Sequence, residues 1–108
     1  MGKIERFEEI RAWQMAKDLV AEIYCTSGKG DFARDFALRD QIRRASISVM
    51  ANIAEGFDRS SDKEFQRFLY MAKGSAGELR SHLVVARELA YITTDEFVAL
   101  RVKAEEVF

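Results

Sequence analysis

The sequence predicts an all-α protein, an antiparallel up-and-down four-helix bundle, and three observations carry this prediction. None of the 108 residues is proline, the residue that most strongly interrupts helices. Apolar residues recur at spacings of three and four, the period of one helix face. Glycines and capping residues divide this pattern into four segments with short connections, and such segments most often pack as an up-and-down bundle. A chain of this length builds one core, so residues 1–108 are expected to form one domain.

The first two helices are delimited by glycines. The first is expected over about residues 7–24, before the sequence GKG at 28–30. The second is expected to follow a turn at residues 31–36 and to end at Gly56, which is well placed to adopt the left-handed conformation of a helix C-cap.

Capping patterns mark the starts of the third and fourth helices. Ser61 precedes Glu64 by three residues, so the hydroxyl is expected to cap the Glu64 amide and the carboxylate to return to the Ser61 amide. This helix is expected to reach about residue 91. Thr93 and Glu96 repeat the pattern before a short fourth helix.

The second helix carries a narrow polar stripe between two apolar flanks. At about 100° per residue, its polar residues fall within about 80° of one another. One flank holds Ile42, Ala45, Val49 and Ile53, and the other holds Ile47, Met50, Ala51 and Ala54. A bundle helix with one wet face shows a single apolar stripe, so we expect one flank to face the protein's own core and the other a neighbouring subunit. The stripe is then a hydrogen-bonded seam at a subunit interface, formed by Gln41, Arg44, Ser48, Asn52 and Glu55. The alternative is the solvent-facing edge of a monomer.

The third helix has a wide apolar face and, elsewhere, a row of cations. Lys73, Arg80 and Arg87 recur every seven residues and therefore share one face. Such a row can contact phosphates, or it can be a solvated face neutralised by Glu78 and Glu88. On the nucleic-acid interpretation, the contacts are Arg39, Arg43, Arg59, Lys73, Arg80 and Arg87.

Small residues interrupt the third helix at positions 74–77, where Gly74 and Gly77 each cost about 1 kcal/mol relative to alanine. Close approach of another helix would offset this cost, and a hinge is the alternative. Tyr70, Val84 and Val85 lie away from the core face, which again indicates an interface.

The sequence offers little to catalysis. His82 is the only histidine and Cys25 the only cysteine, so neither a metal site nor an internal disulfide is expected. No phosphate-binding loop or nucleophile turn is present. We therefore expect no enzyme, no cofactor and no small-molecule substrate. The amino terminus has acids where a signal peptide needs an apolar stretch, and no apolar run is long enough to span a membrane, so a cytoplasmic protein without a membrane partner is expected.

Several motifs together resemble a known family. They are WQ-x-A at 13–16, QIRRASIS at 41–48, NIAEG at 52–56 and AKGS at 72–75, followed by Glu78 and Leu79. This combination resembles the four-helix bundle proteins encoded in intervening sequences of bacterial 23S ribosomal RNA genes.

The resemblance implies an up-and-down bundle that assembles as a homopentameric ring. It also implies kinship with the accessory variability-determinant subunit of diversity-generating retroelements, which associates with a reverse transcriptase and nucleic acid. The expected function is a bacterial, non-enzymatic scaffold or adaptor, associated with RNA or with a nucleic-acid enzyme such as a reverse transcriptase. The alternative is a ring that binds RNA or DNA directly. The chain departs from the pattern of a nucleic-acid-binding ring in its net charge of −1.

Overall fold

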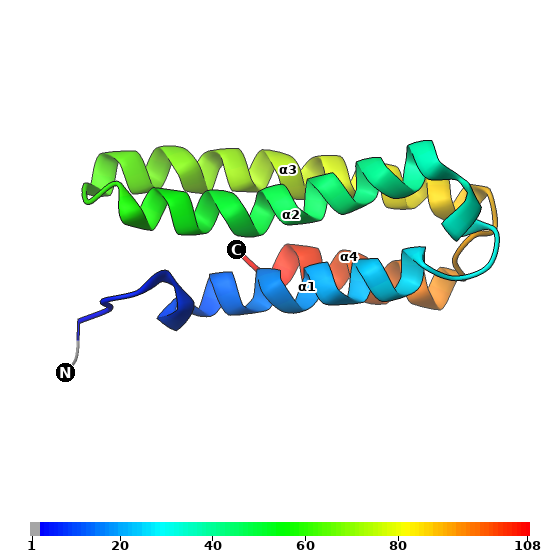
Figure 1. The fold of residues 1–108 in the computed structure, drawn as a ribbon, viewed down its shortest axis with the longest axis horizontal. Helices are drawn as coiled ribbons and strands as arrows, with labels where there is room; N and C mark the ends of the chain where they lie inside the picture. The colour runs from blue at the N-terminus through cyan, green and yellow to red at the C-terminus, as the bar shows by residue number, and fades with distance from the viewer. Residues whose placement is uncertain (1–2) are drawn as a thin grey trace.

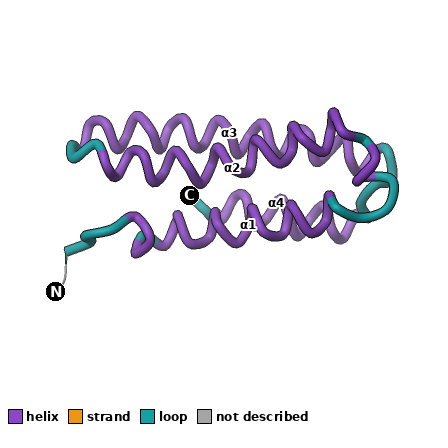
Figure 2. The backbone as a smooth tube through the Cα atoms, viewed as in Figure 1, coloured by secondary structure: helices purple, strands orange, loops and turns teal. Residues whose placement is uncertain are grey.

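Four α-helices run antiparallel along the long axis of the molecule. The computed structural model of the chain describes residues 3–108, whose Cα atoms span 46 × 23 × 18 Å. Successive helices reverse direction (Figure 1), and the connections gather at the two ends of the bundle (Figure 2). The predicted up-and-down four-helix bundle is therefore confirmed. The helices are α1 (Arg11–Ser27), α2 (Phe36–Asp58), α3 (Asp62–Glu88) and α4 (Thr94–Glu106), with 3-10 turns η1 (Phe7–Glu9) and η2 (Phe32–Arg34).

The core receives apolar side chains from all four helices. Leu19 of α1, Ile42 of α2, Leu79 of α3 and Leu100 of α4 are among its buried members. The two longest helices, α2 and α3, lie side by side, and α4 ends about midway along the bundle (Figure 1). The α2 flank predicted to face the core, Ile42, Ala45, Val49 and Ile53, is buried throughout.

The first helix begins later than the sequence predicts. Residues 7–9 form a separate 3-10 turn, and the extended backbone of Ile10 separates this turn from α1. The Glu9 carboxylate accepts hydrogen bonds from the amides of Glu5 and Arg6, at 3.1 and 2.9 Å. Glu9 thus caps the preceding backbone. At the other end α1 continues past the predicted residue 24 to Ser27.

The predicted role of Gly56 is wrong. Helix α2 continues through it to Asp58, and the left-handed residue of the α2–α3 turn is Ser60, with φ 64°. Gly56 is buried, and a Cβ placed on it would lie 2.6 Å from the Phe68 Cβ atom. Because carbon atoms pack at about 3.5–4.0 Å, only glycine lets α2 approach α3 this closely.

The predicted start of α3 is confirmed in one of its two hydrogen bonds. The Ser61 hydroxyl accepts from the Glu64 amide at 3.1 Å. The Glu64 carboxylate, expected to return to Ser61, instead pairs with Arg67 at 3.0 Å.

The end of α3 comes earlier than predicted, at Glu88, because Ala90 adopts the left-handed conformation, with φ 60°. The amide of Tyr91 bonds the carbonyl of Ala86, and the amide of Ala90 bonds the carbonyl of Arg87, both at 2.9 Å. These bonds form a Schellman motif. The start of α4 agrees fully with prediction, since the Thr93 hydroxyl and the Glu96 carboxylate cap each other's amides.

The Asp35 carboxylate joins the connection between α1 and α2 to the connection between α3 and α4. Asp35 caps α2 by accepting from the Leu38 amide, and its other oxygen accepts from the Tyr91 hydroxyl at 2.9 Å. The Tyr91 ring stacks on buried Phe32, with centroids 5.4 Å apart. The hydrogen bond to Asp35, followed by desolvation and the Asp35 charge, raises the pKa of Tyr91 above its ordinary value.

Candidate subunit and nucleic-acid surfaces

The polar seam of α2 lies at its edge with α3. The hydroxyl oxygens of Ser48 and Ser75 lie 2.8 Å apart and join the two helices. The Asn52 side-chain amide donates to the Ser48 carbonyl at 2.8 Å and to the Ser48 hydroxyl at 3.0 Å. All three side chains are half-buried. The predicted seam therefore contains a hydrogen-bonded group of Ser48, Asn52 and Ser75. Ser75 was predicted only as one of the small residues of the third helix.

The rest of the seam faces outward. Gln41 and Arg44 are exposed, and exposed Glu55 pairs at 2.9 Å with Arg59, the C-cap residue of α2. The structure thus divides the five predicted residues into two that bond at the α3 edge and three that remain at the surface.

The second apolar flank of α2 is only partly free. Met50 packs against the core cluster and Ala54 is half-buried, whereas Ile47 and Ala51 are exposed. Part of the surface predicted to meet a neighbouring subunit is therefore covered within the chain itself.

The two glycines among the small residues of α3 have no other helix of the described chain against them, whereas Ser75 bonds α2 and Ala76 is buried in the core. Apart from the adjacent residues and the local backbone of α3 itself, no atom of the described chain lies within 4 Å of a Cβ placed on Gly74, and at Gly77 only the Arg80 guanidinium does, at 3.8 Å. The residues predicted to lie off the core on this helix are exposed, with Tyr70 at 81% and Val85 at 44%. The close helix approach predicted at Gly74 therefore does not occur within the chain.

Five of the six predicted nucleic-acid contacts are engaged inside the protein. Arg43 shows this most clearly, because its Nε donates to buried Ser27 at 2.8 Å and its guanidinium lies 4.4 Å from the centre of the Tyr24 ring. This arginine ties the last turn of α1 to α2. Tyr24 itself is exposed.

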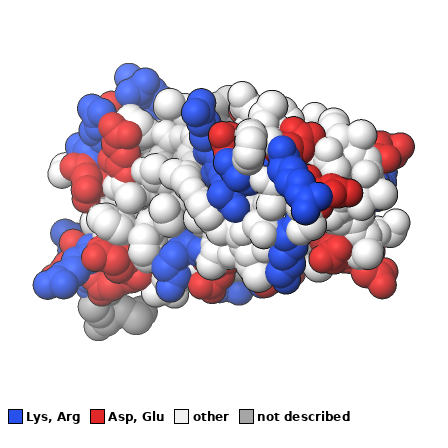
Figure 3. Space-filling view, turned by 45° about the vertical axis from the view of Figure 1, so that its right-hand side comes forward, with Lys and Arg blue, Asp and Glu red and all other residues white. Residues whose placement is uncertain are grey.

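The other cations of the predicted set pair with acids close to them. The bonds are Arg39 to Asp40 at 3.0 Å, Arg59 to Glu55 at 2.9 Å, Arg80 to Glu105 at 3.3 Å, and Arg87 to Glu88 at 3.7 Å. Within residues 3–108, Lys73 forms no ion pair. Figure 3 shows basic and acidic side chains interspersed over one face rather than a single basic field. The basic row of α3 is thus locally neutralised at two of its three cations.

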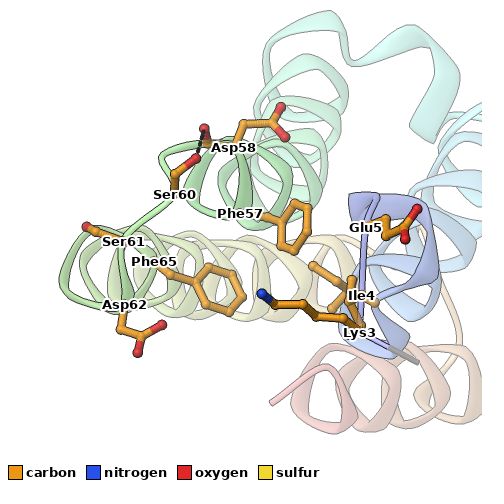
Figure 4. A pocket seen from close by; sticks show the side chains of 10 residues that line it. Lys3, Ile4, Glu5, Phe57, Asp58, Ser60, Ser61, Asp62 and Phe65 are labelled. Carbon is orange, nitrogen blue, oxygen red and sulfur yellow. Dashed lines mark hydrogen bonds between the residues drawn. The ribbon is translucent and has the colours of Figure 1, made fainter. Parts of the chain in front are cut away.

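A hollow of about 730 Å³ lies where the N-terminal segment meets the α2–α3 turn (Figure 4). Its walls include the rings of Phe57 and Phe65, which meet edge to face with centroids 6.5 Å apart. Asp58 and Asp62 also line it. The lining residues include neither histidine nor cysteine.

Among the described residues, no group of three or more His, Cys, Asp or Glu side chains is placed to hold a metal. No described helix has the length and hydropathy to cross a membrane.

The fold and this surface define an all-α four-helix bundle whose central α2–α3 hairpin exposes apolar and small residues. The chain belongs to the 23S rRNA-intervening sequence protein family, which it matches over residues 8–108.

A similar solved structure supports the same architecture. It is the crystal structure of a protein of unknown function from the S23 ribosomal protein family of Bacteroides thetaiotaomicron, which is 22% identical. The similarity covers 89% of this chain and 90% of that chain, with a TM-score of 0.79. At this identity the comparison establishes the fold alone. No curated protein matches the sequence.

Proposed function

We propose that the protein is a non-enzymatic, homo-oligomeric scaffold or adaptor. The observation that carries the proposal is the outer surface of the α2–α3 hairpin. On α3 it exposes Met71, Val85 and Leu89, at 46%, 44% and 50%, and the open backbone of Gly74. Exposed Ala51 lies on α2, the partner helix of the hairpin, at the level of Met71 according to the Ser48–Ser75 contact. We call these five residues the hairpin face.

A second copy of the chain is the occupant that fits the hairpin face. Positions 71, 74, 85 and 89 fall on one side of α3 at about 100° per residue. The Glu78–His82 pair lies between them and divides the face into a group at Met71 and Gly74 and a group at the C-terminal end of α3. Exposed apolar groups of this kind mark an interaction site. Glycine lets a neighbouring helix approach closely. Identical copies with a net charge of −1 repel one another little. The family resemblance supplies the expected stoichiometry, a pentameric ring.

Nucleic acid and its enzymes remain proposed partners of this scaffold. The adaptor would work in the bacterial cytoplasm, in keeping with a single cysteine that has no intramolecular partner. The second candidate function is a ring that binds RNA or DNA directly through the basic rows of α2 and α3. Lys73 favours it, because this cation is not neutralised by any other described residue.

Light scattering coupled to size exclusion tests the scaffold proposal. The wild-type protein is expected to be an oligomer at micromolar concentration. Val85→Glu is expected to give smaller species with unchanged helix content, because a carboxylate buried at an interface without a partner is strongly disfavoured. The matched control is Val102→Glu on α4, where the valine is 37% exposed and lies outside the hairpin face. A wild-type monomer, or equal effects of the two variants, would contradict the proposal.

A further inference from the structure

Tyr70 is a strongly exposed aromatic residue with both charged and apolar side chains around it. It is 81% exposed, more than any other large hydrophobic residue described. Residues three and four positions away are its neighbours on the helix surface, and they are Gln66, Arg67, Lys73 and Gly74. Three of them are polar or charged, although exposed Met71 is the next residue along the chain. Because the cores of protein interfaces are depleted in charged residues, these surroundings are unlike those of an aromatic anchor in a protein–protein contact.

Tyr70 lines two hollows. One of about 530 Å³ is bounded by Lys63, Glu64, Gln66, Arg67, Tyr70 and Met71. The other, of about 350 Å³, lies toward the end of α4. Lys73 lines it together with Gln66, Tyr70 and four apolar residues, Ala12, Leu69, Val107 and Phe108. The ring and the Gln66 amide therefore border both hollows, and each hollow also contains at least one cation.

The charge around Tyr70 is positive overall. Glu64 is the only acid that lines either hollow, and its carboxylate is already paired with Arg67 at 3.0 Å. Lys63 and Lys73 form no ion pair with any residue from 3 to 108. Two cations thus remain free on either side of one exposed ring, although the chain as a whole is slightly acidic.

We propose that Tyr70 is a base-stacking platform for single-stranded nucleic acid. A base would stack on the ring, the Gln66 amide would bond a base edge, and Lys63 and Lys73 would contact phosphates on either side. These lysines are separated by about 15 Å along the helix, a length that holds about four nucleotides at the 3.4 Å spacing of a stacked strand. The site differs from the row of Lys73, Arg80 and Arg87, whose two arginines are paired. Met71, which lines one of its hollows, belongs to the hairpin face, so the site lies at the edge of the proposed subunit contact.

Fluorescence anisotropy with a labelled oligouridine and a labelled oligothymidine at low salt tests the site. Tyr70→Ala is expected to weaken binding about 5-fold to 150-fold, the range measured for losing one base–aromatic stack. Tyr70→Phe retains the ring face and should bind within about twofold of wild type. Replacing Lys63 and Lys73 by glutamine should lower the slope of log affinity against log salt by about 1.4, since each phosphate contact on a single strand contributes about 0.7.

The control is Val84→Ala, another exposed apolar residue of α3, which should leave binding unchanged. Circular dichroism checks that each variant keeps its helices. The proposal is overturned if wild-type protein binds neither strand at low salt, or if Tyr70→Ala binds as wild type does. It is also overturned if Tyr70→Ala dissociates the oligomer, because the ring would then belong to a protein contact. That last result would leave the scaffold proposal intact.

Discussion

Gly56→Ala is expected to destabilise the protein although alanine favours helices. The new Cβ would lie 2.6 Å from the Phe68 Cβ atom and 3.1 Å from the Phe65 ring. The Phe68 Cβ is fixed to the backbone, so α2 and α3 must separate by about 1 Å to restore a normal carbon–carbon distance. Overpacking of this kind costs about 1–3 kcal/mol.

The expected net loss is about 1–2 kcal/mol, because an alanine inside a helix recovers about 1 kcal/mol relative to glycine and we place the clash near the upper end of its range. For a domain of this size, each 1 kcal/mol lowers Tm by about 4–8 °C. Urea and thermal unfolding, followed by circular dichroism at one fixed protomer concentration, measure the change.

A calibration variant isolates the packing contribution. Ala21→Gly at an exposed position of α1 measures the helix-propensity difference alone and should cost about 1 kcal/mol. Adding this value to the loss caused by Gly56→Ala gives the cost of the clash. If Gly56→Ala were as stable as wild type, the close approach of α2 and α3 would not depend on glycine and the reasoning would be refuted.

Three further changes test other contacts. Ala90→Gly should raise the free energy of unfolding by about 1 kcal/mol, because Ala90 adopts a left-handed conformation that favours glycine; an unchanged urea midpoint would refute this. Ser48→Leu should cost about 1–3 kcal/mol and alter the oligomer, because the larger side chain must displace Ser75; unchanged stability and mass would argue against the seam. The raised pKa of Tyr91 means that the folded state retains the phenol proton more strongly than the unfolded state. Its contribution is therefore complete below the unfolded value of about 10 and is lost as pH rises through the folded value. The Tm difference between wild type and Tyr91→Phe should shrink across this pH range, and a constant difference would contradict the assignment.

Most features that depend on neighbours in sequence could be predicted, with the exception of the Glu64 carboxylate, which pairs with Arg67 instead of the Ser61 amide. Features that depend on distant neighbours could not be predicted. The mutual caps of Thr93 and Glu96 were predictable because both bonds join residues three apart. The role of Gly56 was not, because it is set by Phe68 on another helix. Ala90 was missed for a different reason: alanine gives no signal for a left-handed residue, and the surrounding structure imposes that conformation.

In the candidate surfaces, too, features set by helical spacing could be predicted and contacts between helices could not. Helical spacing placed Ser48 and Asn52 on one stripe, but the bond to Ser75 depends on the register between α2 and α3, which one sequence does not contain. Spacing likewise aligned Arg80 with Lys73. The pairing of Arg80 with Glu105 required knowledge of where α4 packs.

The carboxylate of Asp35 couples the local unfolding of two segments that are far apart in sequence. It holds the Leu38 amide at the start of α2 and the Tyr91 hydroxyl between α3 and α4, across 56 positions. If either segment frays, the other loses a hydrogen bond made through Asp35. The two segments should therefore exchange their amide hydrogens as one cooperative unit. In Tyr91→Phe this coupling is removed, and the Leu38 amide should exchange faster while amides at the opposite end of the bundle keep their wild-type protection.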